Sequence, residues 1–358
     1  MRTPRLEIYP DKIRENTKSV SDLCHEKGVQ VACVTKVTSA HLEVAKAMVD
    51  GGADMLADSR IENLWKLREA GFGGPFLLLR LPTPSEAYDV VRTANLSLNS
   101  SLTTLKALSS AAKILKTVHK VIIMVDVGDL REGVWPDQLV DLVKNSKDLP
   151  GIEIVGLGCN LACYGGVIPS VKNMTNLVEQ RELCRRETGL DLPLLSGGNS
   201  SGLPLLASGK MPKEINHFRV GEAIVLGRNV IDRSPWQGTC QDTFVAVAEV
   251  VETEKKPSIP IGERGQDAFG ETQNFIDRGI RTRAICNIGR QDTVVDGLTP
   301  VDSEIIILGG SSDHLILDVE KASKGAKVGG TISFYPGYGA LLALTTSPYV
   351  HKYVVWGK

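Results

Sequence analysis

The chain has no composition bias that would direct it to a polymer or a membrane. Its 41 basic and 42 acidic side chains leave a formal charge of -1, so bulk attraction to nucleic acid or to an anionic surface is not expected. Aromatic residues make up only 5%, no apolar run reaches transmembrane length, and the start MRTPRLEIYP lacks the pattern of a secretory signal. We therefore expect a globular cytoplasmic protein without nucleic-acid or membrane partners.

Cysteine is sparse, and its distribution argues against disulfides. The odd number and the absence of a signal segment fit reduced thiols in the cytoplasm. Cys159 and Cys163 are close in sequence, but no second pair follows at metal-ligand spacing, so we predict no metal site. The seven cysteines are Cys24, Cys33, Cys159, Cys163, Cys184, Cys240 and Cys286.

The first 230 residues or so alternate between short apolar runs and segments with apolar positions three and four residues apart. Continuous apolar strands separated by helices indicate a parallel sheet covered by helices. Eight runs are present, which is the number in a closed β/α barrel, and we predict that fold over its rival, an open doubly wound sheet. The runs span residues 29–36, 53–58, 75–81, 96–99, 120–128, 152–160, 192–198 and 217–227.

The pattern changes after residue 236. Runs such as TFVAVAEVVETEK and GGTISFYPG are typical of strands, and they are separated by turns without a long helical pattern. The sequence therefore predicts a (β/α)8 barrel over residues 1–235 and a separate C-terminal β domain over 236–358.

Functional groups of β/α barrels gather at the carboxyl ends of the strands. Lys36 closes the run VACVT, where proximity to the barrel interior favours a neutral amine that can condense with an aldehyde. A lysine that merely extends into solvent at a strand end is the competing interpretation. Asp126 and Arg131 follow the fifth strand, and Asn160 ends the sixth.

The segment SGGNSSG, residues 196–202, follows the seventh strand and has the composition of a phosphate-binding loop. Asn199 and Ser200 are candidate donors, and we expect the glycines 197, 198 and 202 to allow close approach of the backbone to a phosphate. On the eighth strand, Gly221 would let the backbone N–H groups of residues 221 and 222 reach the same anion. A plain Gly/Ser-rich turn is the alternative.

A lysine opposite a phosphate cradle is the arrangement that pyridoxal 5'-phosphate (PLP) needs, with one covalent and one electrostatic anchor. Arg219 would lie between the two, facing the pyridine nitrogen. A guanidinium does not give up its proton, so the nitrogen would stay unprotonated and the ring would be a weakened electron sink. That favours removal and return of a proton over more demanding chemistry.

The motifs together resemble the alanine-racemase superfamily of fold-type III PLP enzymes, over nearly the whole chain. The matching segments are VTKVTSAHL, DVGDLREGV, SGGNSSG and HFRVGEAIVLG. Within the superfamily, IGRQD, GSSDH and QDAFGE resemble the branch of ornithine and lysine racemases.

The resemblance implies a role for each matching residue. Lys36 would be the Schiff-base lysine and the base for one face of the substrate, Arg131 would order the substrate end of the site, and Arg219 would face the pyridine ring. Asp313 occupies the position of an aspartate near the substrate. The phosphate would be held by Asn199, Ser200, Gly221 and Glu222, with Tyr338 closing over it.

Three positions depart from the family pattern. Phe269 stands where a second-domain tyrosine serves as the opposite base, Ala40 replaces a tyrosine that follows the lysine, and Asn160 replaces a histidine. The second base must therefore be another group, and the residues leave the choice open. Candidates are Asp292, Asp313, His314 and Cys286.

These residues together predict a PLP-dependent amino-acid racemase. The loss of bulk at Ala40 favours a longer substrate such as ornithine or lysine, which would need a carboxylate for its distal ammonium; Asp292, Asp313 and Glu222 are candidates. An alanine or broad-specificity racemase, a fold-type III decarboxylase, a non-catalytic PLP-binding protein and a Schiff-base aldolase are the alternatives. The family also implies a homodimer, with sites built from the barrel of one subunit and the β domain of another.

Overall fold

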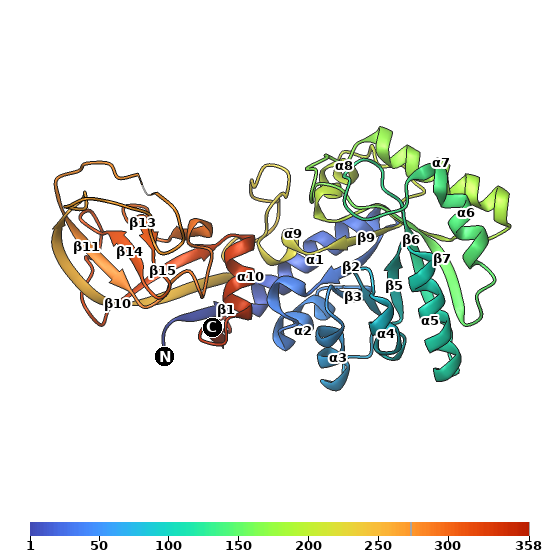
Figure 1. The fold of residues 1–358 in the computed structure, drawn as a ribbon, viewed down its shortest axis with the longest axis horizontal. Coiled ribbons are helices and arrows are strands. Elements are labelled where there is room, and N and C mark those ends of the chain that lie inside the picture. Colours follow the sequence, from blue (N-terminus) through green and yellow to red (C-terminus); the bar gives the residue numbers. More distant parts are fainter. Residues whose placement is uncertain (273, 358) are drawn as a thin grey trace. The chain divides into compact units, whose positions relative to one another are not determined.

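A computed structural model describes residues 1–272 and 274–357 of the chain, which forms two compact units. The larger comprises Pro10–Gln241, and the smaller combines Met1–Tyr9 with Asp242–Lys358 (Figure 1). The boundary thus lies six residues beyond the predicted one, and the first nine residues belong to the second unit. These residues belong to the second unit because their strand, β1, pairs only with strands of that unit's sheet.

The larger unit is a closed barrel of eight parallel strands, so the predicted (β/α)8 fold is confirmed. Every predicted apolar run contributes one strand, in chain order around the barrel. Apart from β5, which matches its run, the strands are shorter than the runs, and the final residues of several runs belong to the loops that follow. The strands are β2 (Gln30–Val34), β3 (Met55–Asp58), β4 (Phe76–Leu78), β5 (Leu96–Asn99), β6 (His119–Met124), β7 (Ile152–Gly158), β8 (Leu194–Ser196) and β9 (His217–Val220).

The barrel interior is filled by aliphatic side chains from alternate strand positions. Ala32 and Val34 of β2 meet Ile122 and Met124 of β6 in one buried cluster. Because residues two apart on a strand point to the same side, each strand places one set of residues inside and the other against the helices. The interior is a packed core, and ligands must bind at its ends.

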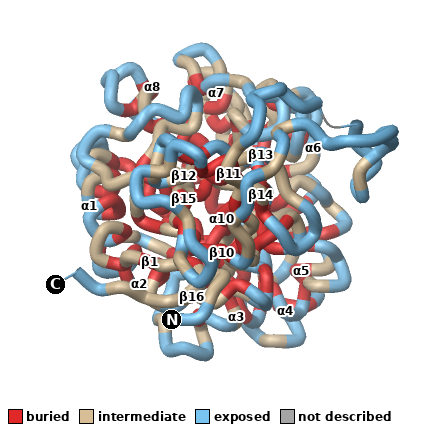
Figure 2. Tube along the Cα trace, turned by 90° about the vertical axis from the view of Figure 1, so that its left-hand side faces the viewer, coloured by how far each residue is buried: buried red, intermediate tan, exposed pale blue. Residues whose placement is uncertain are grey.

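Helices cover the outside of the barrel because each has one apolar face. In α3 the buried residues Ile61, Leu64 and Leu67 recur every three positions. Figure 2 shows buried and exposed positions alternating along α3, α4 and α5. The helices are α1 (Pro10–Glu26), α2 (Leu42–Asp50), α3 (Ile61–Glu69), α4 (Ala87–Thr93), α5 (Leu102–Leu115), α6 (Pro136–Ser146), α7 (Val171–Thr188), α8 (Leu203–Ala207) and α9 (Glu222–Val225).

The smaller unit is built on an eight-stranded sheet in which nearly all pairs are antiparallel. Its longest strand, β10, pairs with β15 through its first half and with β11 from Val250 onward, and a register shift between Val250 and Glu252 marks the change of partner. The strands are β1 (Arg5–Ile8), β10 (Phe244–Pro257), β11 (Ile280–Cys286), β12 (Leu298–Pro300), β13 (Ile306–Gly310), β14 (Leu315–Asp318), β15 (Thr331–Pro336) and β16 (His351–Val354).

The second unit also contains a helix that the sequence pattern did not predict. Helix α10 (Tyr338–Thr346) has the sequence YGALLALTT, which lacks a polar face and so gives no helical periodicity. Ala340, Leu341 and Leu344 are buried. Among the described residues, no helix is long and apolar enough to cross a membrane.

Two buried histidines in the barrel strands are held neutral. His119 is 1% exposed, with Nε2 at 2.8 Å from Ser97 Oγ, and burial lowers its pKa from 6.5 to about 4. His217 is fully buried beside Arg219, and burial followed by the charge of that arginine lowers its pKa to about 3.

We predict acid sensitivity of the fold from these two groups. As pH falls from 6.5 toward 4, the unfolded histidines take up protons that folded His119 and His217 do not, so stability falls by about 1 kcal/mol per pH unit for each. Above pH 6.5 their contribution is fully present. Urea unfolding of His119→Gln across this range should show a shallower dependence on pH than wild type; equal slopes would contradict the assignment.

Candidate active site at the carboxyl ends of the barrel strands

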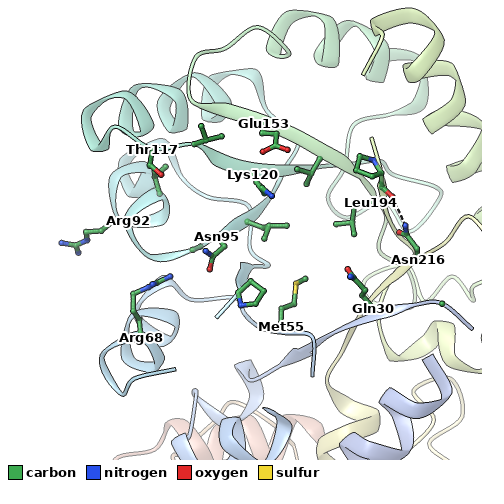
Figure 3. Close-up of a pocket in the computed structure, with 18 residues that line it drawn as sticks. Gln30, Met55, Arg68, Arg92, Asn95, Thr117, Lys120, Glu153, Leu194 and Asn216 are labelled. Carbon is green, nitrogen blue, oxygen red and sulfur yellow. Dashed lines mark hydrogen bonds between the residues drawn. The ribbon is translucent and has the colours of Figure 1, made fainter. Parts of the chain in front are cut away.

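The barrel has two ends of different character. A cavity of about 860 Å³ opens at the amino ends of the strands (Figure 3). The residues that line it include the first or second residue of six strands: Gln30, Met55, Leu96, Lys120, Glu153 and Leu194. None of the predicted site residues lines this cavity. Those of the barrel unit lie at or beyond the carboxyl ends of the strands, as is usual for functional groups in this fold.

Lys36 lies just beyond the end of β2. The strand ends at Val34, and Lys36 begins a single 3-10 turn, η1 (Lys36–Thr38), in which it is half-buried. The Oγ1 of Thr35 donates to Asp58 Oδ2 at 2.7 Å. Asp58 also accepts from Asn63 Nδ2 and the N–H of Arg60, both at 3.0 Å. This buried carboxylate therefore fixes the backbone immediately before the lysine.

The turn after Lys36 has an uncommon backbone. Ser39 and Ala40 have φ of 49° and 48°, in the left-handed region that side chains with a Cβ seldom adopt. Ala40 is fully buried, so the position where the resemblance implies a tyrosine holds only a methyl group against the core.

Ser200 joins the loops that follow β8 and β9. It is 3% exposed and begins the single turn η3 (Ser200–Gly202). Its Oγ accepts from the N–H of Gly221 at 3.3 Å and of Ala223 at 3.2 Å. The N–H of Glu222, between them, is the first of α9 and has no acceptor within that helix. Three backbone donors and a hydroxyl therefore lie together at this end of the barrel.

The glycines of this loop differ from our expectation. A Cβ on Gly197 would lie 3.0 Å from the ring of Phe218 and 2.4 Å from Ile215, and one on Gly202 would lie 2.9 Å from the same ring. These two glycines therefore make room for Phe218. A Cβ on Gly198 would have no neighbour within 4 Å, but its φ of +121° is a conformation that other residues rarely adopt. Of the three glycines, Gly198 alone is therefore required by the backbone conformation of the turn.

Asn199 organises the loop from its side chain. Its Nδ2 donates to Leu161 O at 2.8 Å and Asn160 Oδ1 at 3.1 Å, and its Oδ1 accepts from the N–H of Ser201. Asn160 Nδ2 and Ser201 Oγ are buried and have no hydrogen-bond partner among the described residues. Because buried donors rarely stay unsatisfied, these two groups indicate that a ligand or water with acceptor atoms binds here.

The charged side chain of Arg219 is buried in the barrel wall. It is 4% exposed, and its guanidinium donates to Cys159 O at 2.6 Å and to Ser196 Oγ. Ser196 Oγ also lies 2.7 Å from His217 Nδ1. Burial lowers the pKa of Arg219, although no proton acceptor near neutral pH is strong enough to discharge a guanidinium.

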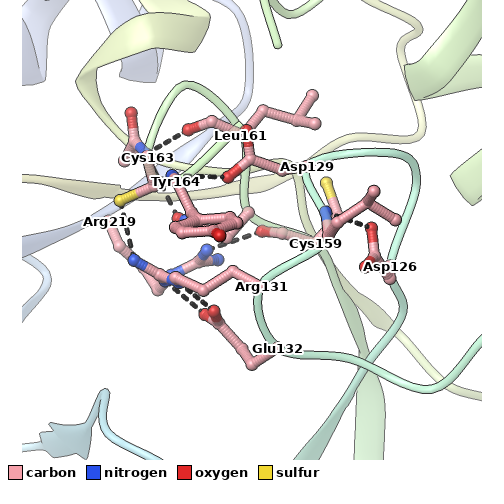
Figure 4. Close-up of polar contacts among 12 residues, drawn as sticks. Asp126, Asp129, Arg131, Glu132, Cys159, Leu161, Cys163, Tyr164 and Arg219 are labelled. Atoms are coloured by element: carbon pink, nitrogen blue, oxygen red, sulfur yellow. Dashed lines mark hydrogen bonds and ion pairs between the residues drawn. The ribbon is translucent and has the colours of Figure 1, made fainter. Parts of the chain in front are cut away.

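Arg131 lies in the loop after β6, where two acidic side chains organise the backbone (Figure 4). Asp126 Oδ1 accepts from the N–H of Gly128 at 2.8 Å. The buried Asp129 accepts from the N–H groups of Tyr164 at 2.9 Å and Val167 at 3.1 Å, which ties this loop to the one after β7. The guanidinium of Arg131 pairs with Glu132 through two N–H groups, and hydrogen bonding to Glu132 is the main cause of the raised pKa of Arg131.

Arg131 also contacts the loop after β7, where its Nη1 donates to the Sγ of Cys163. Cys163 is exposed, whereas Cys159 is buried and burial raises the pKa of its thiol to about 12. Among the described residues, no group of three or more His, Cys, Asp or Glu side chains is placed to hold a metal ion.

The remaining predicted residues belong to the second unit. Tyr338 is the half-buried first residue of α10, and Asp313 is exposed and accepts from Gln291 Nε2. Phe269 is 45% exposed, with the guanidinium carbon of Arg290 at 4.4 Å from its ring centre.

The candidates for a second base differ in environment. Asp292 is buried and accepts from Ser347 Oγ at 2.9 Å. Burial raises the pKa of Cys286 to about 12, which keeps its thiol protonated near neutral pH. Asp313 and His314 are exposed.

Several residues that shape the site were given no individual role by the sequence. Ser196, His217, Asp58, Asp129 and Glu132 all make side-chain contacts that shape it. Asp58 and Ser196 do carry a signal, since each is a polar residue that ends an apolar strand. The contacts of the others required the three-dimensional structure, because Asp129 and Glu132 resemble ordinary loop residues and His217 begins an apolar run without a sign of its partner.

Four features define the class of protein. They are the closed barrel, the turn that begins with Lys36, the hydroxyl and N–H groups around Ser200, and the buried Arg219. Residues 8–229 match the family described as alanine racemase, N-terminal domain, and the chain belongs to that family.

Two relatives are similar over almost the full chain. It is 45% identical to the ornithine racemase of Acetoanaerobium sticklandii over 352 residues, which cover 98% of this chain and 99% of that protein. It is 40% identical to the lysine racemase of Thermotoga maritima over 349 residues, which cover 98% of each. The fold is similar to that of an alanine racemase from a D-cycloserine-producing Streptomyces lavendulae, with a TM-score of 0.77 at 17% identity over 100% of this chain and 99% of that one.

We predict that Ser200→Ala destabilises the barrel unit. The change leaves the N–H groups of Gly221 and Ala223 without their acceptor, at a cost of about 1–3 kcal/mol in the free energy of unfolding. Ser208→Ala, an exposed serine just after α8, is the matched control and should stay within about 0.5 kcal/mol of wild type. Urea denaturation measures both, and equal stabilities for the two variants would contradict the role of Ser200.

Proposed function

We propose that this protein is a PLP-dependent racemase of a basic amino acid such as ornithine or lysine. The observation that carries the proposal is the set of groups at one end of the barrel: Lys36, the Ser200 cradle and the buried Arg219. The high similarity to an ornithine racemase and a lysine racemase over nearly the full chain supports racemisation and a basic substrate.

The residues fit PLP on two grounds that do not depend on the family. The buried unpartnered donors of Asn160 and Ser201, beside the N–H groups around Ser200, suit a phosphate. Arg219 supplies a permanent cation inside the barrel wall, suited to the basic nitrogen of a pyridine. PLP when bound supplies an aldehyde for amines and a conjugated ring that withdraws electrons from an amino acid's α-carbon.

In the proposed mechanism the chain's own residues hold the reactants and move protons. Asn199, Ser200 and the N–H groups of Gly221 and Glu222 hold the phosphate, and we assign Tyr338 to the same group. Arg219 would face the ring nitrogen and, as a guanidinium, would not give it a full proton, so bound PLP would be a weaker electron sink.

The substrate end of the site holds the amino acid and exchanges its α-proton. Arg131 binds the α-carboxylate as a guanidinium fork, and Asp313 helps to position the substrate. The Nζ of Lys36 removes or returns the α-proton on one face, and a second group does so on the other. The pKa of Cys286, raised to about 12, disfavours it as that group.

The decarboxylase alternative receives less support. Decarboxylation benefits from a strong electron sink, which needs a carboxylate that allows the pyridine nitrogen to be protonated. The corresponding position here holds Arg219, whose guanidinium bonds to the neutral acceptors Ser196 Oγ and Cys159 O. The similarity over the whole length to two racemases points the same way.

The first functional prediction concerns exchange at the α-carbon. In deuterium oxide, the PLP-loaded protein should incorporate deuterium into ornithine or lysine faster than into alanine. Lys36→Ala should stay folded by circular dichroism but lose this exchange, whereas Lys46→Ala, an exposed lysine on α2, should keep it. Faster exchange of alanine would contradict the proposal of a basic substrate but not the proposal of a racemase. Absence of PLP binding would reject the cofactor.

The second functional prediction concerns assembly. We propose a homodimer with active sites shared between subunits, the commonest closed arrangement for an oligomer. Sedimentation equilibrium should give twice the chain mass of 38.7 kDa at assay concentrations. A species of 38.7 kDa with full activity would contradict the shared site.

A further inference from the structure

The carboxylates near the carboxyl end of the barrel differ in what they already bind. Asp129 uses both oxygens for backbone N–H groups, and Asp126 uses one oxygen for the N–H groups of Gly128 and Leu130. Glu222 pairs with Arg233, outside the Arg131 loop. Glu132 is distinct because its partner, Arg131, is the residue assigned to the substrate.

Within the Arg131–Glu132 pair, the carboxylate is the enclosed member. The Glu132 side chain is 15% exposed, whereas that of Arg131 is 41% exposed. Both carboxylate oxygens of Glu132 accept from Arg131 (Figure 4). The guanidinium therefore has room to exchange its partner, and the carboxylate has little access to water that would replace a lost partner.

Glu132 is also a carboxylate whose charge acts on both guanidiniums of this region, those of Arg131 and Arg219. Arg219 hydrogen-bonds only neutral acceptors, Ser196 Oγ and Cys159 O, in the contacts described. Burial is the main influence on its pKa and lowers it, and Arg131 lowers it further, while the charge of Glu132 raises it. The same carboxylate thus acts on both cations.

We propose that Glu132 binds the distal ammonium of a basic substrate and thereby selects for it, an inference that rests on the proposed racemase function. When the substrate's α-carboxylate recruits Arg131, Glu132 loses its hydrogen bonds in a partly desolvated position. Leaving such a charge unpaired is costly. Ornithine and lysine carry a second cation that restores the pair, whereas alanine carries none.

This exchange explains selectivity without a rigid pocket wall. A site that holds a buried polar group discriminates strongly against a substrate that leaves the group unpaired, and a size filter discriminates weakly. In this site the charge of Glu132 would supply the selection.

The test compares ornithine with norvaline, which has the same carbon chain and lacks the distal amine. With the PLP-loaded enzyme, Glu132→Gln should lower the ratio of kcat/KM for ornithine to that for norvaline by about tenfold or more. The loss should appear as a higher KM for ornithine, while kcat/KM for norvaline stays constant or rises. Calorimetric binding should show the same loss for ornithine.

The matched control is Glu187→Gln. Glu187 forms an exposed ion pair with Lys144 at 2.8 Å between α7 and α6, and its removal should leave the ratio unchanged. If Glu132→Gln does not fold, the double variant Arg131→Gln/Glu132→Gln removes both charges and leaves neither unpaired. Its ratio should also fall by about tenfold or more.

Two outcomes would overturn the proposal. An equal loss of kcat/KM for ornithine and norvaline in Glu132→Gln would show that Glu132 only positions Arg131. An unchanged ratio in the variant that folds would show that another group binds the distal ammonium. Failure of the wild-type enzyme to racemise ornithine or lysine would instead reject the proposed function, which separates the two results.

Discussion

The buried charge of Arg219 constrains the rest of the barrel site. A guanidinium inside a barrel wall must find acceptors there, and it uses the carbonyl of Cys159 beyond β7 and the hydroxyl of Ser196 on β8. The same hydroxyl contacts His217, whose pKa burial lowers to about 3, so no second cation forms beside the first. Three neighbouring strands, β7, β8 and β9, thus contribute to the surroundings of one charge. Glu132, in the loop after β6, is the carboxylate that offsets this charge.

Around that charge, the loops are fixed by side chains that bond to backbone. Asp129 links the loops after β6 and β7, Asn199 links those after β7 and β8, and Ser200 links those after β8 and β9. Each link uses a side-chain acceptor or donor to satisfy backbone groups that the strand ends leave unpaired. The result is a rim in which Asn199 and Ser200, themselves candidate binding groups, and Asp129 hold neighbouring loops together.

The different character of the two ends of the barrel follows from its parallel topology. All strands end at the same side, so the polar residues that terminate them converge there, while the residues that begin them line the cavity at the other side. This is why Lys120 and Glu153, despite their charge, belong to a different region from Lys36 and Glu132. Charge alone would not have separated them.

The sequence by itself determined the architecture and the main groups of the site. Eight apolar runs in alternation with amphipathic segments can bury their apolar surfaces only as a helix-covered parallel sheet, and local residue types mark Lys36, Ser200 and Arg219 at strand ends. The chain's start and the helix α10 were missed, because a four-residue strand and a helix apolar all round carry no periodic signal.

Only the tertiary structure decided which polar residues meet. Gly197 and Gly202 belong to a segment with the composition of a phosphate loop, yet the structure requires glycine there because the ring of Phe218, 21 and 16 residues further along the chain, packs against them. Glu132 looks like a surface residue next to Arg131, and only the structure shows that its side chain is largely buried. Contacts between residues distant in sequence set burial, and burial is what gives a charge its partner and its cost.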